Sequence, residues 1–226
     1  MSNRGDIIDG SQAAGSTKGL IYTKKCGWVD LGHANPIGGA ANLLTSLTLN
    51  NHGIGNKYYK LPYSQWMQKR GVKVGIIERY IIKKDLSPRE LKSVALSIFM
   101  DVSNEFESFQ NNWLFRKFTN SGYSAEDLVS DLISFYRAVD PETDYIQLCE
   151  PVPKETALYI WDTYGPVGEN KNRTFAPYLY PLSPTSGGGP MSVEIPWFLN
   201  TIKPGKEGKL FEKERYGIGG RSRFEK

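Results

Sequence analysis

Two stretches in which apolar residues recur with a helical period constrain the fold more than any other feature of this sequence. The first is expected to run from about Ser87, with Pro88 at its first helical position, to about Gln110. Its apolar stripe consists of Leu91, Val94, Ala95, Ile98, Val102, Phe106 and Phe109. The second is expected to begin at Ser124, where Ser-Ala-Glu-Asp resembles a capping arrangement, and its apolar face consists of Leu128, Leu132, Phe135, Tyr136 and Val139. Hydrophobic residues make up 39% of the chain, which is enough to build a core around these stripes.

Three segments rich in β-branched and aromatic residues, 19–31, 58–63 and 72–82, are predicted to be strands. A helix is expected after the first of them, with Asn35 as its cap and Pro36 at its first position. Shorter helices are predicted at Glu142–Cys149 and Lys154–Tyr164. The sequence therefore predicts an α+β fold, in which a small sheet packs on two or more amphipathic helices and a long irregular C-terminal arm follows.

The chain of 226 residues suits one domain with a trailing arm. Residues 1–18 are polar and are expected to be a flexible lead. Residues 19–164 are expected to form the α+β core domain, and the Pro- and Gly-rich residues 165–226 an irregular arm packed on it.

Composition narrows the classes of function. No run of 18 apolar residues is present, so no membrane span is expected, and the first residues lack the apolar region of a secretory signal peptide. The net charge is +4, and the basic residues are scattered, which disfavours a nucleic-acid partner. A modest positive charge suits an anionic cell-wall polymer or membrane surface as well as simple solubility.

His33 is the first candidate for chemistry, since only one other histidine, the predicted turn residue His52, occurs in the chain. It follows a predicted strand at a turn, which is a common place for a functional side chain. Strand alternation predicts that Val29, Leu31 and His33 share one face, and that Cys26, Trp28 and Asp30 share the other. This parity opposes a Cys26–His33 nucleophilic pair unless a bulge intervenes. The alternative for His33 is a capping or core histidine with satisfied hydrogen bonds.

The cysteines Cys26 and Cys149 are the only two in the chain. Each is expected to be a buried or inert thiol before it is a nucleophile, and a single bridge between them stays open.

Carboxylates on the two long helices complete the candidate site. The helical wheel places Glu105 inside the apolar stripe and Glu107 on the opposite side, so Glu105 is the favoured acid–base group. The alternative is that the stripe ends before Glu105 and leaves it at the surface. Asp127 and Asp131 lie one turn apart on the next helix, where Asp127 is expected to cap Ser124 and Asp131 to face a cleft. A histidine with several carboxylates forms an acid–base relay or binds a divalent metal, although the sequence has no HExxH or CxxC motif.

The segment GLIYTKKCGWVDLGHA, followed by DVSNEFESFQ and YSAEDLVSDLISF, resembles a group of bacterial proteins of unknown function that are often envelope lipoproteins. The resemblance covers roughly residues 19–140 and rests mainly on the first motif. It implies that a shared polar site contains Asp30, His33, one of Glu105 or Glu107, Asp127 and Asp131. The chain departs from that group in having Asp131 where its pattern has Asn, and in lacking a signal peptide or lipobox.

These observations lead to three hypotheses. The first is a cell-envelope hydrolase, a peptidoglycan amidase or peptidase with His33, Asp30 and Glu105 as acid–base groups, or a muramidase with two carboxylates. The missing export signal favours an antibacterial effector, made in the cytoplasm and delivered to the periplasm by a dedicated machine such as type VI secretion, with an immunity protein as partner. The second is a papain-like amidase that uses Cys26 or Cys149 with His33. The third is a non-catalytic binding or structural module.

Overall fold

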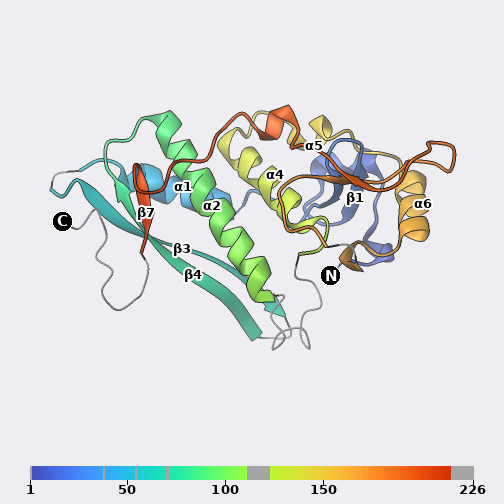
Figure 1. The fold of residues 1–226 in the computed structure, drawn as a ribbon, viewed down its shortest axis with the longest axis horizontal. Helices are drawn as coiled ribbons and strands as arrows, with labels where there is room; N and C mark the ends of the chain where they lie inside the picture. The colour runs from blue at the N-terminus through green and yellow to red at the C-terminus, as the bar shows by residue number, and fades with distance from the viewer. Residues whose placement is uncertain are drawn as a thin grey trace. The chain divides into compact units, whose positions relative to one another are not determined.

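The computed structural model describes residues 2–37, 39–53, 55–69, 72–110, 123–169 and 171–214. Helices and small antiparallel sheets alternate along the chain, so the predicted α+β class is confirmed (Figure 1). The chain divides into two compact units. Unit 1 consists of residues 1–36 and 107–201, and unit 2 consists of residues 37–106 and 202–226. The predicted division at residues 18 and 164 follows composition rather than contacts and stays a prediction.

A long antiparallel hairpin dominates unit 2. It is formed by β3 (Tyr58–Lys69) and β4 (Val72–Lys83), and the short β7 (Phe211–Lys213) adds to the other edge of β4 (Figure 1). In this register Tyr80 of β4 lies opposite Lys213 of β7. The last described part of the chain is therefore held in the sheet of unit 2.

Strand β3 is longer than the segment 58–63 predicted from composition, and it contains Pro62. Proline lacks the N–H that a central strand needs, but within the described residues β3 is an edge strand whose neighbour is β4. The strand therefore continues past Pro62 to Lys69.

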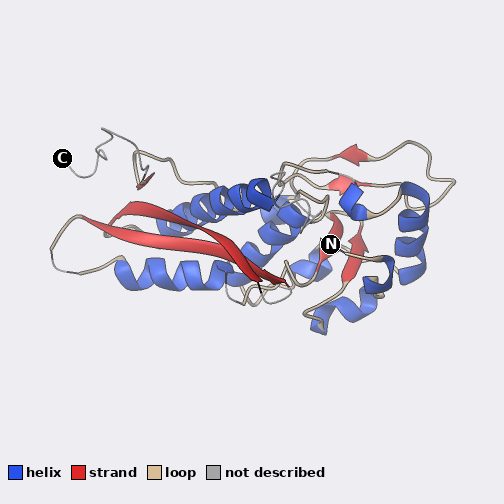
Figure 2. Ribbon diagram, turned by 90° about the horizontal axis from the view of Figure 1, so that it is seen from below, coloured by secondary structure: helices blue, strands red, loops and turns tan. Residues whose placement is uncertain are grey.

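Helices α1 (Gly39–Asn50) and α2 (Pro88–Gln110) pack on this sheet, and α2 runs along the hairpin in both ribbon views (Figures 1 and 2). The Tyr59 hydroxyl donates to a carbonyl oxygen of α1 at 3.3 Å, and the Gln65 amide donates to Ser103 of α2 at 2.9 Å. Tyr59 and Gln65 lie on the same face of β3 because side chains alternate along a strand. Both helices therefore contact one face of the sheet, and the predicted extent of α2 is confirmed.

Unit 1 begins with a short hairpin of β1 (Leu20–Thr23) and β2 (Gly27–Asp30), in place of the single strand predicted over residues 19–31. The turn is fixed by the Thr23 hydroxyl, which accepts from the Cys26 N–H and donates to the Gly27 carbonyl. Gly27 has φ +67°, and a Cβ there would lie 2.3 Å from a backbone oxygen of Tyr178. The prediction of one continuous strand was wrong because a positive-φ glycine reverses the chain.

The helices of unit 1 are α4 (Asp127–Val139), α5 (Tyr145–Leu148) and α6 (Lys154–Tyr164). The last matches its prediction residue for residue. The aromatic core of the unit has Trp28 at its centre, with ring centroids of Tyr22 and Trp161 at 5.2 and 5.9 Å in edge-to-face contact.

Both ends of the predicted core domain continue into ordered contacts. Ile7, in the polar lead, is fully buried in the core of unit 1, and the N–H of Ile8 donates to the carbonyl of Leu20. After Tyr164 the described chain contains only 3-10 turns and strands of two or three residues, as expected for the irregular arm. None of the described helices has the length and apolar character needed to cross a membrane.

Candidate active site

The end of β2 and the turn that follows it present His33. The Asp30 carboxylate accepts hydrogen bonds from the backbone N–H groups of Gly32 at 2.7 Å and His33 at 3.3 Å. The N–H of Ala34 donates to the Asp30 carbonyl at 2.8 Å, and the N–H of Asn35 donates to Gly32. Asp30 therefore organises a tight turn in which His33 is the exposed tip.

This turn also corrects two predictions. The parity that placed Asp30 and His33 on opposite faces was wrong, because the strand ends at Asp30. The helix predicted from Asn35 begins instead at Gly39, because the turn bonds of residues 34 and 35 precede it.

The first turns of α4 bring two carboxylates to the imidazole. His33 Nδ1 lies 3.7 Å from Asp131 Oδ1 and 3.9 Å from Asp127 Oδ1. The His33 side chain is 40% exposed, while those of Asp127 and Asp131 are 9% and 16% exposed. The imidazole therefore stands at the solvent side of a pair of carboxylates that recede into the protein. Asp127 also fulfils its predicted capping role, since its Oδ2 accepts the N–H of Ser124 at 2.8 Å.

Glu107 lies deeper, in the last turn of α2. Its side chain is buried, and Oε2 accepts the backbone N–H of Tyr123 at 2.8 Å. The helical-wheel prediction placed Glu105 on the buried face and Glu107 on the opposite face. In the structure Glu107 is buried instead, and the Glu105 side chain is 41% exposed. At this end of α2 the buried face includes Ser103, Phe106 and Glu107, so Glu105 falls at its edge.

Glu126 is a member of this cluster that the sequence did not single out. It is buried, its Oε1 accepts from the Ser2 hydroxyl at 3.2 Å, and the same hydroxyl lies 3.4 Å from Asp30 Oδ2. Its Oε2 is buried and has no hydrogen-bond partner within the described part of the chain. The sequence signal was the pair Glu126-Asp127 at the start of α4, in which only Asp127 was assigned a capping role.

Burial and mutual repulsion raise the pKa values of the inner carboxyl groups. For Asp127 the pKa is well above its usual range because of burial first, and then because of the charges of Glu107, Glu126 and Asp131. Burial also raises the pKa of Glu107, against hydrogen bonds from Tyr123 and Asp127 that lower it. Burial likewise raises the pKa of Glu126. The interior of the cluster therefore retains protons at pH values where ordinary carboxyl groups have lost them.

The same negative charges also raise the pKa of the imidazole. Burial lowers the pKa of His33, but the carboxylates of Asp131, Asp30, Glu107 and Glu126 outweigh it, so the pKa is raised. His33 is thus held as an imidazolium over a wider pH range than a free histidine.

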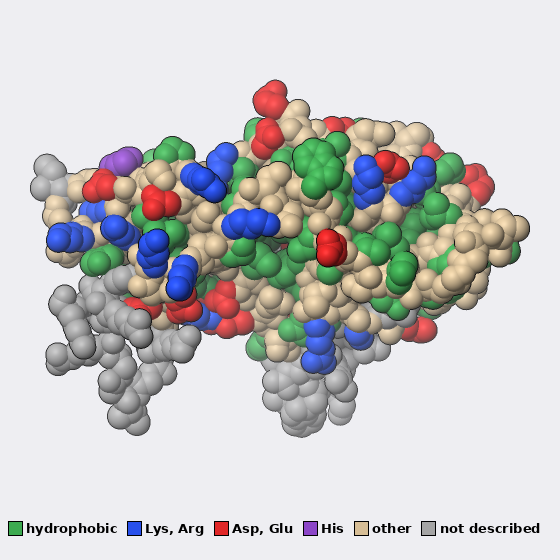
Figure 3. Space-filling model, turned by 45° about the horizontal axis from the view of Figure 1, so that its top comes forward, with side chains coloured by type: hydrophobic (Ala, Val, Ile, Leu, Met, Phe, Trp, Pro, Cys, Tyr) green, Lys and Arg blue, Asp and Glu red, His purple; other side chains and the backbone are tan. Residues whose placement is uncertain are grey.

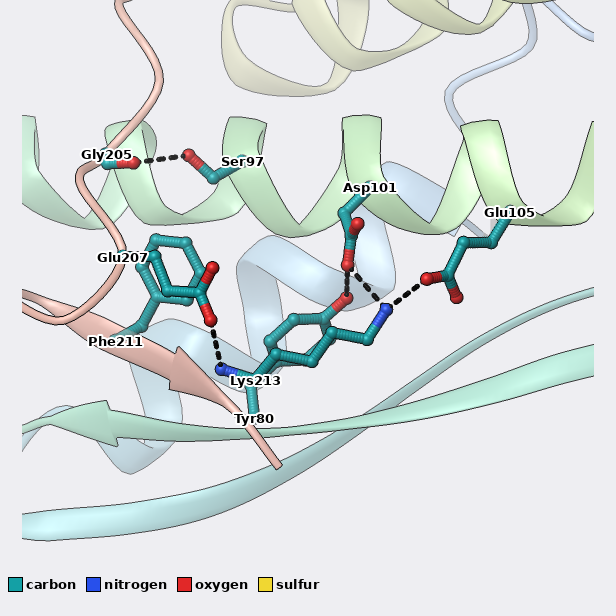
Figure 4. A pocket seen from close by; sticks show the side chains of 8 residues that line it. All are labelled: Tyr80, Ser97, Asp101, Glu105, Gly205, Glu207, Phe211 and Lys213. Atoms are coloured by element: carbon teal, nitrogen blue, oxygen red, sulfur yellow. Dashed lines mark hydrogen bonds and ion pairs between the residues drawn. The ribbon is translucent and has the colours of Figure 1, made fainter. Parts of the chain in front are cut away.

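Glu105, the favoured acid–base residue from the sequence, belongs to unit 2. Its side chain is 41% exposed and forms an ion pair with Lys213 of β7 (Figure 4). Lys213 Nζ also lies 2.9 Å from Asp101 and 3.5 Å from Glu78. Burial lowers the pKa of Lys213, and the carboxylates of Glu105 and Asp101 more than offset it, so the net shift is upward. Glu105 is therefore part of an ion-pair network in unit 2, whereas His33 and Asp131 lie in unit 1.

That network borders a cavity of about 530 Å³ in unit 2. Its wall consists of Tyr80, Ser97, Asp101, Glu105, Gly205, Glu207, Phe211 and Lys213, drawn in Figure 4. The Tyr80 hydroxyl donates to Asp101 at 2.6 Å, and in Figure 4 the carboxylates of Asp101 and Glu105 point toward the Lys213 ammonium group. The ammonium group of Lys213 pairs with Asp101 and Glu105, as in a structural ion-pair network, while Glu207 accepts the backbone N–H of Lys213.

Cys26 lies in the β1–β2 turn, where its Sγ is 3.0 Å from Sγ of Cys149. Both side chains are buried. Burial and the neighbouring Cys26 thiol hold the pKa of Cys149 well above its usual range, which disfavours the thiolate that a nucleophile requires. The geometry gives no support to the cysteine-amidase hypothesis.

The other histidine, His52, is exposed in unit 2, where Nδ1 lies 3.1 Å from Asp85. Among the residues that the structure describes, no group of His, Cys, Asp or Glu side chains has the arrangement of a metal site. On the face drawn in Figure 3, basic and acidic side chains are intermixed.

Comparison with protein-family models, curated proteins and solved structures finds no match. The resemblance to envelope lipoproteins therefore stays a prediction.

Proposed function

We propose that the protein is a hydrolase in which His33 and Asp131 are the acid–base pair. The observation that carries the proposal is the position of the half-exposed imidazole, within 4 Å of two carboxylates at the open side of a buried acidic cluster. Hydrolytic sites commonly pair two titratable groups whose surroundings push their pKa values in useful directions. Here the imidazolium is favoured, and Asp131 is the more exposed of the two carboxylates within 4 Å of it.

The proposed roles follow from the favoured imidazolium of His33 and from the position of Asp131 beside it. The Asp131 carboxylate accepts a proton from a water molecule as that water attacks an amide carbonyl carbon. His33, as the imidazolium, donates a proton to the leaving nitrogen when the carbon–nitrogen bond breaks. The products are a carboxylic acid and an amine, and the proton taken up by Asp131 returns to His33 through solvent. His33 is assigned the acid role because its raised pKa favours the protonated imidazole.

Asp30 and the inner carboxyl groups are positioning residues in this proposal. Asp30 fixes the turn that carries His33, through its bonds to the N–H groups of residues 32 and 33. The negative charges of Asp131, Asp30, Glu107 and Glu126 favour the protonated imidazole.

The proposed substrate is peptidoglycan, and the proposed bond is an amide of its peptide stems. A site rich in carboxyl groups favours substrates with a free ammonium group near the scissile bond, and wall peptides carry such groups. Delivery to the periplasm as an antibacterial effector, with an immunity protein, belongs to the same proposal. A muramidase that uses Glu105 with Asp131 is not favoured, because Glu105 is engaged by Lys213 in the other unit.

Digestion of purified sacculi, followed by mass spectrometry of the released fragments, tests the proposal. Wild-type protein is expected to release fragments with new amine and carboxyl ends, and folded His33→Gln and Asp131→Asn variants are expected to lose at least about a hundredfold in rate. Glu105→Gln is the matched control, since it neutralises a carboxylate on α2 outside the proposed site and should retain activity.

Expression with a periplasmic signal gives an independent readout, in which wild-type protein lyses a Gram-negative host and the two site variants do not. Sacculus digestion at equal rates by wild type, His33→Gln and Asp131→Asn would remove these residues from the reaction. Absence of any released fragment, with all proteins folded, would reject the hydrolase.

One observation favours a second candidate, a module that binds a cationic group without cleaving its ligand. The Glu126 Oε2 atom is buried and has no hydrogen-bond partner in the described chain, which is costly unless a ligand supplies a donor. Retention of wild-type protein on sacculi without any fragment release, weakened by Glu126→Gln, would support this candidate over the hydrolase.

A further inference from the structure

The thiols of Cys26 and Cys149 face each other in unit 1, although 123 positions separate them in the sequence. Their Sγ atoms lie 3.0 Å apart, and the two residues are 1% and 0% exposed. The Cys149 sulfur also lies 3.1 Å from the Tyr145 carbonyl, so it contacts both the Cys26 thiol and the backbone of α5.

The backbone on both sides holds these cysteines in place. The N–H of Lys25 donates to the carbonyl of Cys149 at 3.1 Å, and the N–H of Lys24 donates to Glu150 at 2.9 Å. Next to these bonds, Thr23 and Pro151 form an antiparallel bridge. The β1–β2 turn and the segment after α5 are thus paired like two strands, with one cysteine on each.

We propose that Cys26 and Cys149 are a disulfide-forming pair, and that oxidation links the β1–β2 turn covalently to the end of α5. A disulfide places the two sulfurs about 2 Å apart, so the thiols need to approach by only about 1 Å. This inference does not rest on the proposed hydrolase. It concerns a covalent modification of the core that any oxidising compartment imposes.

The reaction requires a disulfide donor, such as oxidised glutathione or a disulfide-bearing oxidoreductase. One cysteine thiolate attacks a donor sulfur, which releases one donor thiol and forms a mixed disulfide. The second cysteine thiolate then attacks the protein sulfur of that mixed disulfide, and the other donor thiol leaves. The protein loses two electrons and two protons, and the donor disulfide is reduced to two thiols.

Burial determines when this reaction occurs. The side chains of both cysteines are closed to a donor in the folded state, so the first attack needs local opening or a chain that is still folding. We therefore expect rapid oxidation during refolding and slow oxidation of the native protein.

The test is to refold the full chain in a buffer of reduced and oxidised glutathione, to alkylate free thiols with N-ethylmaleimide under denaturing conditions, and to map peptides. The expected result is no alkylated cysteine, a mass lower by two hydrogen atoms, and a cross-linked peptide that contains Cys26 and Cys149. The melting temperature of the oxidised protein should fall by about 10 °C on reduction with dithiothreitol, because the bond closes a long loop. Cys149→Ala is the control, and its melting temperature should not respond to dithiothreitol.

Two results would overturn the proposal. One is a refolded protein that keeps two alkylatable thiols at a glutathione ratio that oxidises a control disulfide protein. The other is glutathione attached to either cysteine as the stable product in place of the cross-link. Both are measured on the wild-type chain, so they decide the question even where Cys149→Ala fails to fold.

Discussion

His33 Nδ1 lies 3.7 Å from Asp131 Oδ1, at a point where a two-stranded hairpin meets the first turns of α4. The imidazole is partly open to solvent and the carboxylate mostly closed to it. This relationship joins a turn near the N-terminus to a helix about a hundred positions later, and it makes the protonation of each group depend on the other.

The first prediction concerns the titration of His33. Its pKa is raised above the usual 6.5 because the surrounding carboxylates outweigh burial, so its ring protons should titrate above that value in NMR spectra. Asp131→Asn should lower this pKa, because Asp131 supplies the largest favourable charge. A His52→Asn variant assigns the remaining signal to His33. Titration of His33 at or below 6.5 would contradict the arrangement described.

The second prediction is the dependence of stability on pH. Asp127 has a folded-state pKa well above its unfolded value of about 3.8, so the folded state binds its proton more tightly. The stability contribution of this group is fully present below the unfolded pKa, and it is lost as pH rises through the folded pKa. The raised pKa values of Glu107, Glu126 and His33 act in the same direction.

Asp127→Asn mimics the protonated carboxyl group and should therefore stabilise the protein by about 1 kcal/mol at pH 8, with little effect at pH 4. Urea unfolding at the two pH values measures the difference. A variant that is less stable than wild type at pH 8 would contradict the prediction that ionisation of Asp127 destabilises the folded protein.

The third prediction concerns the ion-pair network of unit 2. Lys213→Met removes the one ammonium group that lies within ion-pair distance of Glu78, Asp101 and Glu105 in the described structure. We expect a loss of about 1–3 kcal/mol at pH 7, because three carboxylates then repel one another.

The loss should be smaller at pH 4, where carboxyl protonation relieves that repulsion. Lys60→Met is the matched control, because its exposed pair with Glu214 should contribute at most about 1 kcal/mol. Equal effects of the two substitutions in urea unfolding would contradict a partly buried network.

The fourth prediction concerns Ile7, which lies in the segment expected from composition to be a flexible lead. Its side chain is fully buried against the core of unit 1, so Ile7→Ala should cost about 2–5 kcal/mol. Ile37→Ala is the control, since that side chain is 81% exposed. Equal melting temperatures of the two variants in calorimetry would contradict a structural role of Ile7 and support a flexible segment at residues 1–18.

Local patterns were enough to predict much of the secondary structure. The period of apolar residues and the helix-start signals located α2 and α6, and strand propensity located β4, because these signals involve neighbours in sequence. The same signals placed His33 at a turn after the first strand, and Asp127 and Asp131 one turn apart. They could not show that a positive-φ Gly27 splits the first strand.

Only the tertiary structure decided which partners these groups have. The wheel of α2 favoured Glu105 over Glu107, but Glu107 is buried beside Tyr123 and Asp127, while Glu105 pairs with Lys213. Cys26 was considered as a partner of His33, and its neighbour is Cys149. Helix and strand periods are local properties that a sequence carries directly. Burial, shifted pKa values and thiol contacts depend on segments that meet only after the chain has folded, and this is why the sequence proposed the members of the site while the fold selected among them.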